Sequence, residues 1–176
     1  MVPSVPGARR VVAREAVDAA YDRLAAALQP LVDREPCVLL GVLLGGLIPL
    51  ARLATRLEGD FLLDTCRAGR YGTATRGGAP AWLAAPTTDL GGRHVLLVDD
   101  IWDEGVTLDF IARHCRDAGA RQVTTVVLVR KRHGRGLTGF QPDFTGLEVG
   151  DEFVFGCGMD YQGRWRHLPD LWAVAG

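Results

Sequence analysis

One short segment brings four acidic residues close together: residues Val95 to Thr107 (VLLVDDIWDEGVT) join an apolar run to four carboxylates, a glycine and a threonine. In open α/β sheets, ligands bind beyond the carboxyl ends of the strands, where the N-terminus of the next helix offers free N–H groups to a phosphate. Gly105 would let the backbone approach a ligand closely, and the Thr107 hydroxyl could donate a further hydrogen bond. The order of these residues predicts a phosphate site.

The first two carboxylates of the segment, Asp99 and Asp100, would suit another part of the same ligand. Carboxylates accept hydrogen bonds from sugar hydroxyls and help to hold a hard cation. Any single acidic residue at a strand end fits a solvated loop or a helix cap equally well. The complete pattern nevertheless favours a ligand site.

The segment resembles the phosphoribosyl pyrophosphate motif of type I phosphoribosyltransferases, and it is most similar to the hypoxanthine-guanine branch of that family. The resemblance implies transfer of a phosphoribosyl group from phosphoribosyl pyrophosphate to hypoxanthine or guanine, giving IMP or GMP and pyrophosphate, with Mg²⁺ as cofactor. Asp99 and Asp100 would hold the ribose hydroxyls and contact the metal, and Asp103 would be the general base. The residues implied to bind the 5-phosphate are Asp103, Glu104, Gly105, Val106 and Thr107.

The resemblance extends over roughly residues 38–171 and implies a purine site. Lys131 would donate to the 6-oxo group, Phe153 would stack on the base, and the Val154 backbone would read its edge. Asp160 would contact the metal. Taken alone, Lys131 fits a solvated strand end and Phe153 fits a core residue.

Residues 41–46 (GVLLGG) are similar to the pyrophosphate loop of the family, in which Leu44 and Gly45 would face pyrophosphate. Leu44 stands where many members carry lysine or arginine, so one expected cation is missing. Arg166 lies where the family has an arginine for pyrophosphate, and its guanidinium suits paired phosphate oxygens. The resemblance also implies a cis peptide bond between Leu43 and Leu44.

Residues 67–80 (RAGRYGTATRGGAP) have the composition of a mobile loop that could close over the site. Many family members have a serine before the tyrosine of this loop, whereas here Arg70 precedes Tyr71. Arg70 or Arg76 could supply the charge that is missing at Leu44.

Two further expectations concern ionisable side chains. Like charges disfavour ionisation, so the neighbours Asp99, Asp100 and Glu104 would raise the pKa of Asp103. The histidines, His133 among them, match no metal spacing and receive no role.

Apolar runs that alternate with helical patterns predict an α/β fold: one domain with a mostly parallel sheet flanked by helices, as in type I phosphoribosyltransferases, and a small C-terminal hood. The core would span about residues 8–135. The hood would span about residues 136–176, include the short apolar pieces 144–149 and 153–156, and accept N-terminal residues. The expected strands are 37–44, 60–66, 82–85, 94–98 and 122–129, and the expected helices are 11–31, 47–57 and 106–118.

The composition of the chain limits the classes of partner that it is expected to bind. With 20 basic and 21 acidic residues the net charge is −1, which speaks against a nucleic-acid partner. The longest apolar run, residues 38–50, is broken by glycine and proline, so no membrane span is expected. Scattered cysteines and the absence of a secretory signal pattern favour a cytoplasmic protein, and the resemblance implies a homodimer or homotetramer.

Two alternatives stay open. The acceptor could be xanthine or another base, because contacts near purine position 2 are not resolved by the sequence. The chain could also be a catalytically silent regulator that senses phosphoribosyl pyrophosphate and binds RNA or DNA, since fold alone does not define function.

Overall fold

The computed structural model describes residues 3–70, 80–134 and 139–174. Its main element is a six-stranded sheet in the order β4-β3-β2-β5-β6-β7, in which only β4 runs antiparallel to its neighbour. The fold is thus the mostly parallel α/β arrangement expected. The strands of this sheet are β2 (Cys37–Val42), β3 (Phe61–Arg70), β4 (Pro80–Ala84), β5 (His94–Trp102), β6 (Gln122–Lys131) and β7 (Phe144–Val149).

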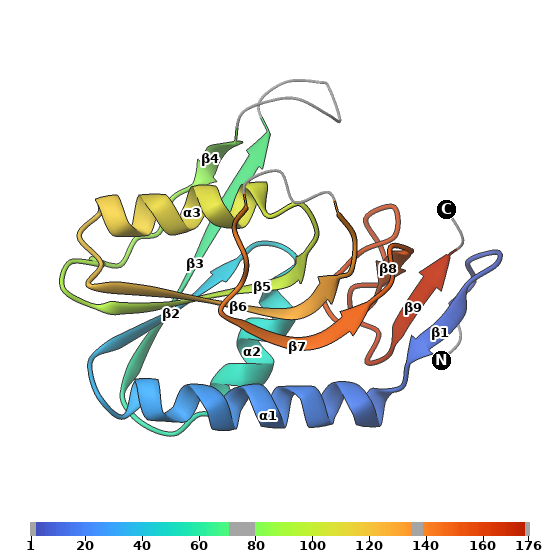
Figure 1. Cartoon of the computed structure of the whole chain (residues 1–176), viewed down its shortest axis with the longest axis horizontal. Coiled ribbons are helices and arrows are strands. Elements are labelled where there is room, and N and C mark those ends of the chain that lie inside the picture. The colour runs from blue at the N-terminus through green and yellow to red at the C-terminus, as the bar shows by residue number, and fades with distance from the viewer. Residues whose placement is uncertain (1–2, 71–79, 135–138, 175–176) are drawn as a thin grey trace.

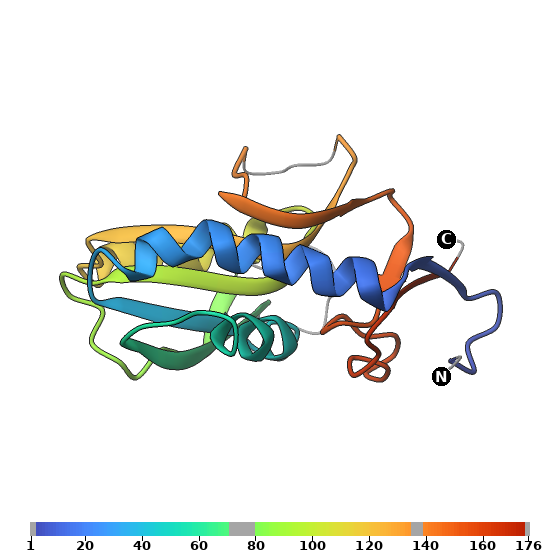
Figure 2. The same ribbon diagram turned by 90° about the horizontal axis from the view of Figure 1, so that it is seen from below.

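Helices cover both faces of the sheet (Figure 1). Helices α1 (Arg14–Val32) and α2 (Leu47–Ala54) pack into one apolar core, and α3 (Val106–Asp117) packs into a second core on the opposite face. Seen from below, α1 runs lengthwise across the sheet (Figure 2). It starts three residues later than expected, because residues 9–12 form a strand, and it continues past Pro30.

Strand β5 lies between β2 and β6, so its carboxyl end is at the middle of one sheet edge. The strand is longer than the sequence indicated, and Asp99 and Asp100 belong to it instead of to a loop. Pairing with β6 continues through Asp99↔Val127 to Trp102↔Arg130, and this inter-strand pairing keeps the backbone extended. The acidic loop is therefore confined to the few residues before α3.

A second sheet forms the hood at the end of the molecule where both chain ends lie (Figure 1). It has the order β1-β9-β8, with β1 (Arg9–Val12), β8 (Phe153–Phe155) and β9 (Leu171–Val174), so N-terminal residues do join it. Strand β7 was expected in the hood, but it pairs in parallel with β6 in the large sheet. Asp143 Oδ2, just before β7, accepts hydrogen bonds from the Thr125 N–H (2.7 Å) and hydroxyl (2.8 Å), which anchors β7 to β6.

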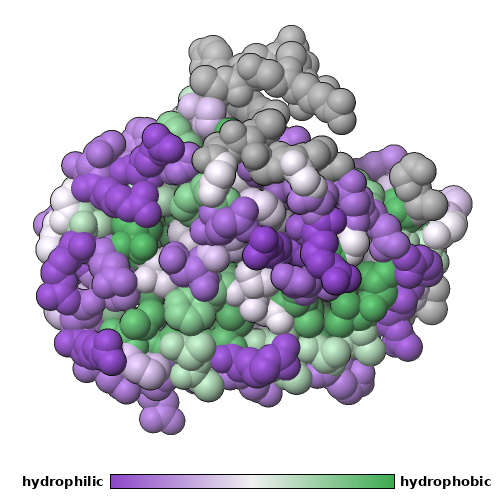
Figure 3. Space-filling view, viewed as in Figure 1, coloured by the Kyte–Doolittle hydropathy of each residue, from purple (hydrophilic) through white to green (hydrophobic). Residues whose placement is uncertain are grey.

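The expected mobile loop is partly strand. Residues 67–70 extend β3 and pair with β4, while Tyr71 and Arg76 lie outside the described residues. Hydrophilic residues are spread over the face shown in Figure 3, between separate apolar patches. In the described part of the chain, no helix is long and apolar enough to cross a membrane.

Candidate active site

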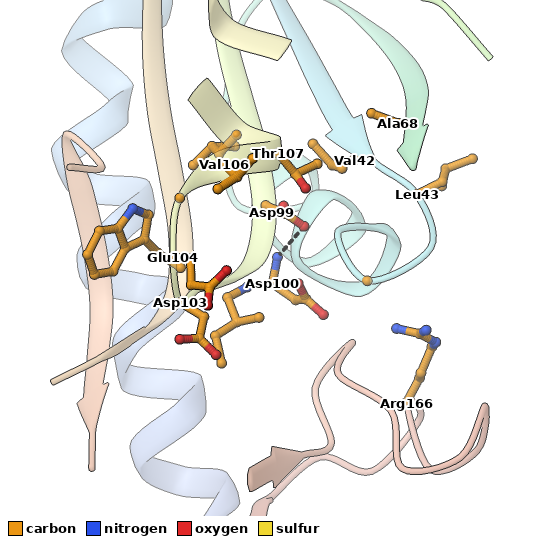
Figure 4. Close-up of a pocket in the computed structure, with 15 residues that line it drawn as sticks. Val42, Leu43, Ala68, Asp99, Asp100, Asp103, Glu104, Val106, Thr107 and Arg166 are labelled. Atoms are coloured by element: carbon orange, nitrogen blue, oxygen red, sulfur yellow. Dashed lines mark hydrogen bonds between the residues drawn. The ribbon is translucent and has the colours of Figure 1, made fainter. Parts of the chain in front are cut away.

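A cleft of about 380 Å³ opens at the carboxyl ends of β2 and β5, beside the N-terminus of α3 (Figure 4). This volume lies within the usual range for a small-molecule site. Arg166 reaches the cleft from the hood, across from the two aspartates of β5. The cleft brings together these residues expected from the sequence: Gly45, Asp99, Asp100, Asp103, Glu104, Gly105, Val106, Thr107 and Arg166.

The turn into α3 is built for close backbone approach. Gly105 caps the helix with φ +78°, and a Cβ added there would lie 2.6 Å from Trp102 Nε1, so a side chain is excluded for two reasons. The first N–H groups of an α-helix have no partner within it, and Val106 and Thr107 of that turn line the cleft. The geometry suits an anion, and binding of the 5-phosphate there stays a prediction.

Asp99 and Asp100 are held by short local hydrogen bonds: the Asp100 N–H donates to Asp99 Oδ1 (2.9 Å), and the Ile101 N–H donates to Asp100 Oδ1 (2.8 Å). Burial raises the pKa of both carboxyls, and the neighbouring Asp100 raises that of Asp99 further. A ligand that brings positive charge or hydroxyl donors would relieve this cost.

The donor set at the cleft fits a divalent cation that is shared with a substrate. Carboxylate oxygens such as those of Asp99 and Asp100 are hard ligands. Within the described residues, no group of three or more His, Cys, Asp or Glu side chains could hold a metal. One or two carboxylates completed by substrate oxygens is the arrangement that Mg²⁺ commonly adopts.

Asp103 lies between two nitrogen donors from beyond the strand. Lys131 Nζ donates to its Oδ2 (3.0 Å), and His133 Nε2 lies 2.5 Å from its Oδ1. Burial alone would raise the pKa of Asp103, but the hydrogen bonds and charges of Lys131 and His133 outweigh it and lower the pKa. The expected upward shift was therefore wrong, because it left out Lys131 at the end of β6 and His133 just after that strand.

His133 is the site residue that sequence reasoning missed. It follows β6 by two residues, shows no motif spacing, and matches no catalytic position of the resembled family. Its nearness to Lys131 in the sequence was the only signal, and contact with Asp103 requires β5 and β6 to lie side by side.

Arg166 is oriented by the hood. Its Nη1 donates to the Gly158 carbonyl (2.6 Å) and its Nη2 to Asp160 Oδ1 (2.5 Å), while Asp160 Oδ2 accepts the Gly163 N–H (2.7 Å). Asp160 does not line the cleft, so its expected contact with a metal stays a prediction.

The pyrophosphate loop is formed as expected in one respect. The peptide bond between Leu43 and Leu44 is cis, which confirms that expectation. Leu43 and Gly45 line the cleft, whereas the Leu44 side chain is 49% exposed and does not.

The expected purine residues do not line this cleft. Lys131 reaches it only through Asp103, Phe153 is exposed with its ring edge-on to Tyr161, and Val154 is buried. The Arg70 side chain, like Tyr71, lies outside what the structure describes.

Comparison with known proteins decides the family. A family model described as the phosphoribosyl transferase domain matches residues 9–162. The chain is 34% identical over 131 residues to the hypoxanthine-guanine phosphoribosyltransferase of Bacillus subtilis, covering 74% of this chain and 72% of that protein. The chain belongs to the phosphoribosyltransferase family. It is also 32% identical over 163 residues to the enzyme of that name from Streptococcus pneumoniae, covering 90% of this chain and 88% of the relative.

Solved phosphoribosyltransferase structures agree with the fold. A hypoxanthine-guanine phosphoribosyltransferase from Bacillus anthracis superposes with a TM-score of 0.88 at 25% identity, covering 95% of this chain and 98% of the other. A hypoxanthine phosphoribosyltransferase from Staphylococcus aureus also gives 0.88, at 23% identity, over 94% of this chain and 90% of that one. The expected type I phosphoribosyltransferase fold is confirmed.

Gly45 tests how tightly the loop packs on Asp100. A Cβ at Gly45 would lie 2.1 Å from Asp100 Oδ2, whereas one at Gly150 would meet nothing within 4 Å. Gly45→Ala should lower the free energy of unfolding by about 1–3 kcal/mol, the usual cost of overpacking. The control Gly150→Ala should change it by less than about 0.5 kcal/mol. Urea titration measures both, and equal stabilities would contradict the packing.

Asp99→Asn tests the cost of holding two carboxyl groups side by side near the end of β5. The pKa of Asp99 is raised in the folded state, so stability falls as pH rises through the unfolded value near about 4, and it stays lower at neutral pH. In metal-free protein the variant should gain about 1 kcal/mol at pH 7 and nothing below about pH 3. Urea titration with chelator at both pH values measures this. Exposed Asp117→Asn serves as control, and a gain of equal size at pH 3 would contradict the ionic origin.

Proposed function

We propose that this phosphoribosyltransferase transfers the 5-phosphoribosyl group of phosphoribosyl pyrophosphate to hypoxanthine or guanine and releases pyrophosphate. One observation carries the choice of base: Lys131 Nζ lies 3.0 Å from Oδ2 of Asp103, and Asp103 lines the cleft. A 6-oxopurine presents a carbonyl oxygen at position 6, which can accept a hydrogen bond from the Lys131 ammonium. Next to it, a protonated nitrogen 7 can donate to the Asp103 carboxylate. Adenine presents a donor at position 6 and would face Lys131 unfavourably. The names of the relatives support the same substrates.

The cleft supports the sugar phosphate in two parts. The turn from Gly105 to Thr107 would take the 5-phosphate on its N–H groups, and Asp99 and Asp100 would accept from the ribose hydroxyls. Arg166, held by the hood, would bind the pyrophosphate that leaves. Its guanidinium supplies a cation on that side, where Leu44 supplies none.

The metal is proposed to be Mg²⁺, held by Asp99 or Asp100, with Asp160 as the further candidate. When bound, it would offset negative charge on the pyrophosphate. The residues of the chain would do the rest: they position the ribose against the base and remove a proton from the purine. Much of the rate enhancement would come from positioning and electrostatic stabilisation.

Asp103 would act as the general base. Its lowered pKa keeps it ionised at neutral pH, which is the form that accepts a proton. When a 6-oxopurine binds, Lys131 would turn from Asp103 to the 6-oxo group. Loss of that cation would raise the proton affinity of Asp103 just as the purine proton must leave.

We also propose that the protein acts in the cytoplasm, as a homodimer or homotetramer, without a nucleic-acid partner. The four cysteines support a reducing compartment, since all are buried free thiols. Light scattering after size exclusion would establish the assembly.

A nucleotide-formation assay with phosphoribosyl pyrophosphate, Mg²⁺ and five bases tests the substrate class. Hypoxanthine and guanine should be used in preference to xanthine, adenine and uracil. Asp103→Asn, which keeps the size of the side chain but cannot take the proton, should lower kcat by about 100-fold or more.

Asp117→Asn, an exposed exchange at the far end of α3, is the matched control and should retain the wild-type rate. Preference for xanthine or adenine would reject the proposed acceptor. Tight binding of phosphoribosyl pyrophosphate without turnover of any base would favour the sensing regulator instead.

A further inference from the structure

His133 shares Asp103 with Lys131, but it holds the other oxygen. Its Nε2 lies 2.5 Å from Oδ1, whereas Lys131 Nζ lies 3.0 Å from Oδ2. The His133 side chain is only 4% exposed, and Asp103 lies on the wall of the cleft. An ionised carboxylate can only accept hydrogen bonds, so Nε2 of the imidazole carries the hydrogen and donates it.

The imidazole ring is oriented by its surroundings. It stacks on Trp102 with ring centroids 6.0 Å apart and planes at 11°, and the Trp102 ring is itself buried and covered by the Arg130 guanidinium at 5.3 Å. The Arg132 N–H donates to the Val149 carbonyl (2.9 Å), which ties the segment before His133 to the end of β7. A donor held in this way is preorganised toward Oδ1.

Substrate binding affects the two donors, Lys131 and His133, differently. Under the proposed function, Lys131 must leave Oδ2 to meet the 6-oxo group, so Oδ2 becomes available to the purine. His133 faces Oδ1, the oxygen away from Lys131, and can keep its contact throughout. This contact restrains rotation of the Asp103 carboxylate at the moment when Lys131 departs.

We propose that His133 is a positioning residue for the transfer reaction: its Nε2–H holds Oδ1 of Asp103 so that Oδ2 faces the proton of the bound purine. This inference rests on the proposed function, because it assigns Asp103 the role of base. His133 need not touch the substrate. Its contribution is to the orientation and ionisation of Asp103.

A plain packing role makes the opposite demand on the side chain. If His133 only fills space beside Trp102, the flat ring is what matters and the donor is dispensable. If His133 positions Asp103, the donor is essential, and a side chain that places an N–H there without an aromatic ring should largely replace it. Two substitutions separate these cases, since glutamine can place an amide N–H near the position of Nε2 and phenylalanine keeps the ring alone.

In the full-length protein, His133→Phe should lower kcat about 10- to 100-fold, the range for losing a hydrogen bond to a charged group, with KM for phosphoribosyl pyrophosphate nearly unchanged. His133→Gln should stay within about threefold of wild type. His133→Asn, whose shorter amide falls short of Oδ1, should resemble His133→Phe. His114→Phe, the same exchange at an exposed histidine of α3, should leave kcat unchanged.

The pH profile provides a second readout. Within the described residues, the charged groups near Asp103 include Lys131 at the end of β6, His133 two residues after it, and Glu104 next along the loop. Loss of the His133 donor removes an interaction that favours the ionised form, so the acidic limb of kcat/KM should move to higher pH in His133→Phe. His133→Gln should keep the limb closer to wild type.

Wild-type turnover in His133→Phe, or a loss in His133→Gln as large as in His133→Phe, would overturn the inference in favour of packing. Failure of wild type to use any purine would reject the proposed function instead. The contact itself would still be testable then, by NMR titration of the Asp103 carboxyl carbon. A higher pKa in His133→Phe than in wild type would support the contact, and an unchanged pKa would overturn it.

Discussion

Two neighbouring carboxylates near the end of a buried strand constrain how the loop and the hood pack around the cleft. Burial raises the pKa of Asp99 and Asp100, so the folded state bears their charge at a cost. The surrounding backbone closes in on the pair all the same. A Cβ at Gly45 would overlap Asp100, and one at Gly158 in the hood would lie 2.3 Å from the Gly45 carbonyl. Loop and hood therefore meet at Asp100. The two carboxylates lower the stability of the folded protein, and a bound ligand can offset that loss.

Positive charge reaches the cleft from elements other than the pyrophosphate loop. Leu44 contributes no cation, and Arg166 comes from the hood, where Gly158 and Asp160 fix its guanidinium. The hood thus contributes to the wall of the cleft, although among the described residues its strands β8 and β9 pair with each other and with the N-terminal strand β1 and not with the large sheet. This explains why the cleft combines residues that lie more than a hundred positions apart, from Gly45 to Arg166.

Much of the fold, and the residues expected at the phosphate, could be predicted from the sequence, since both depend on residues that follow one another along the chain. An apolar run, carboxylates, a glycine and a helix follow one another directly, and the cis peptide of the loop was implied by the resemblance. The features that could not be predicted depend on pairing between segments that are distant in the sequence. Strand β5 extends to Trp102 because β6 lies beside it, and β7 pairs with β6 in the large sheet, next to the hydrogen bonds that Thr125 donates to Asp143. The contact of His133 depends on the same neighbouring strands.

The pKa of Asp103 shifts in the direction opposite to the one that its local sequence suggests. Its carboxylate neighbours along the chain suggested a raised pKa, yet Lys131 at the end of β6 and His133 just after it lower that pKa. The pKa values of Asp99 and Asp103, four residues apart, therefore shift in opposite directions: burial and Asp100 raise the first, whereas Lys131 and His133 lower the second. The difference serves the proposed chemistry. A base kept ionised by a lysine that the purine itself draws away has low proton affinity while the site is empty, and gains affinity only when the substrate is in place.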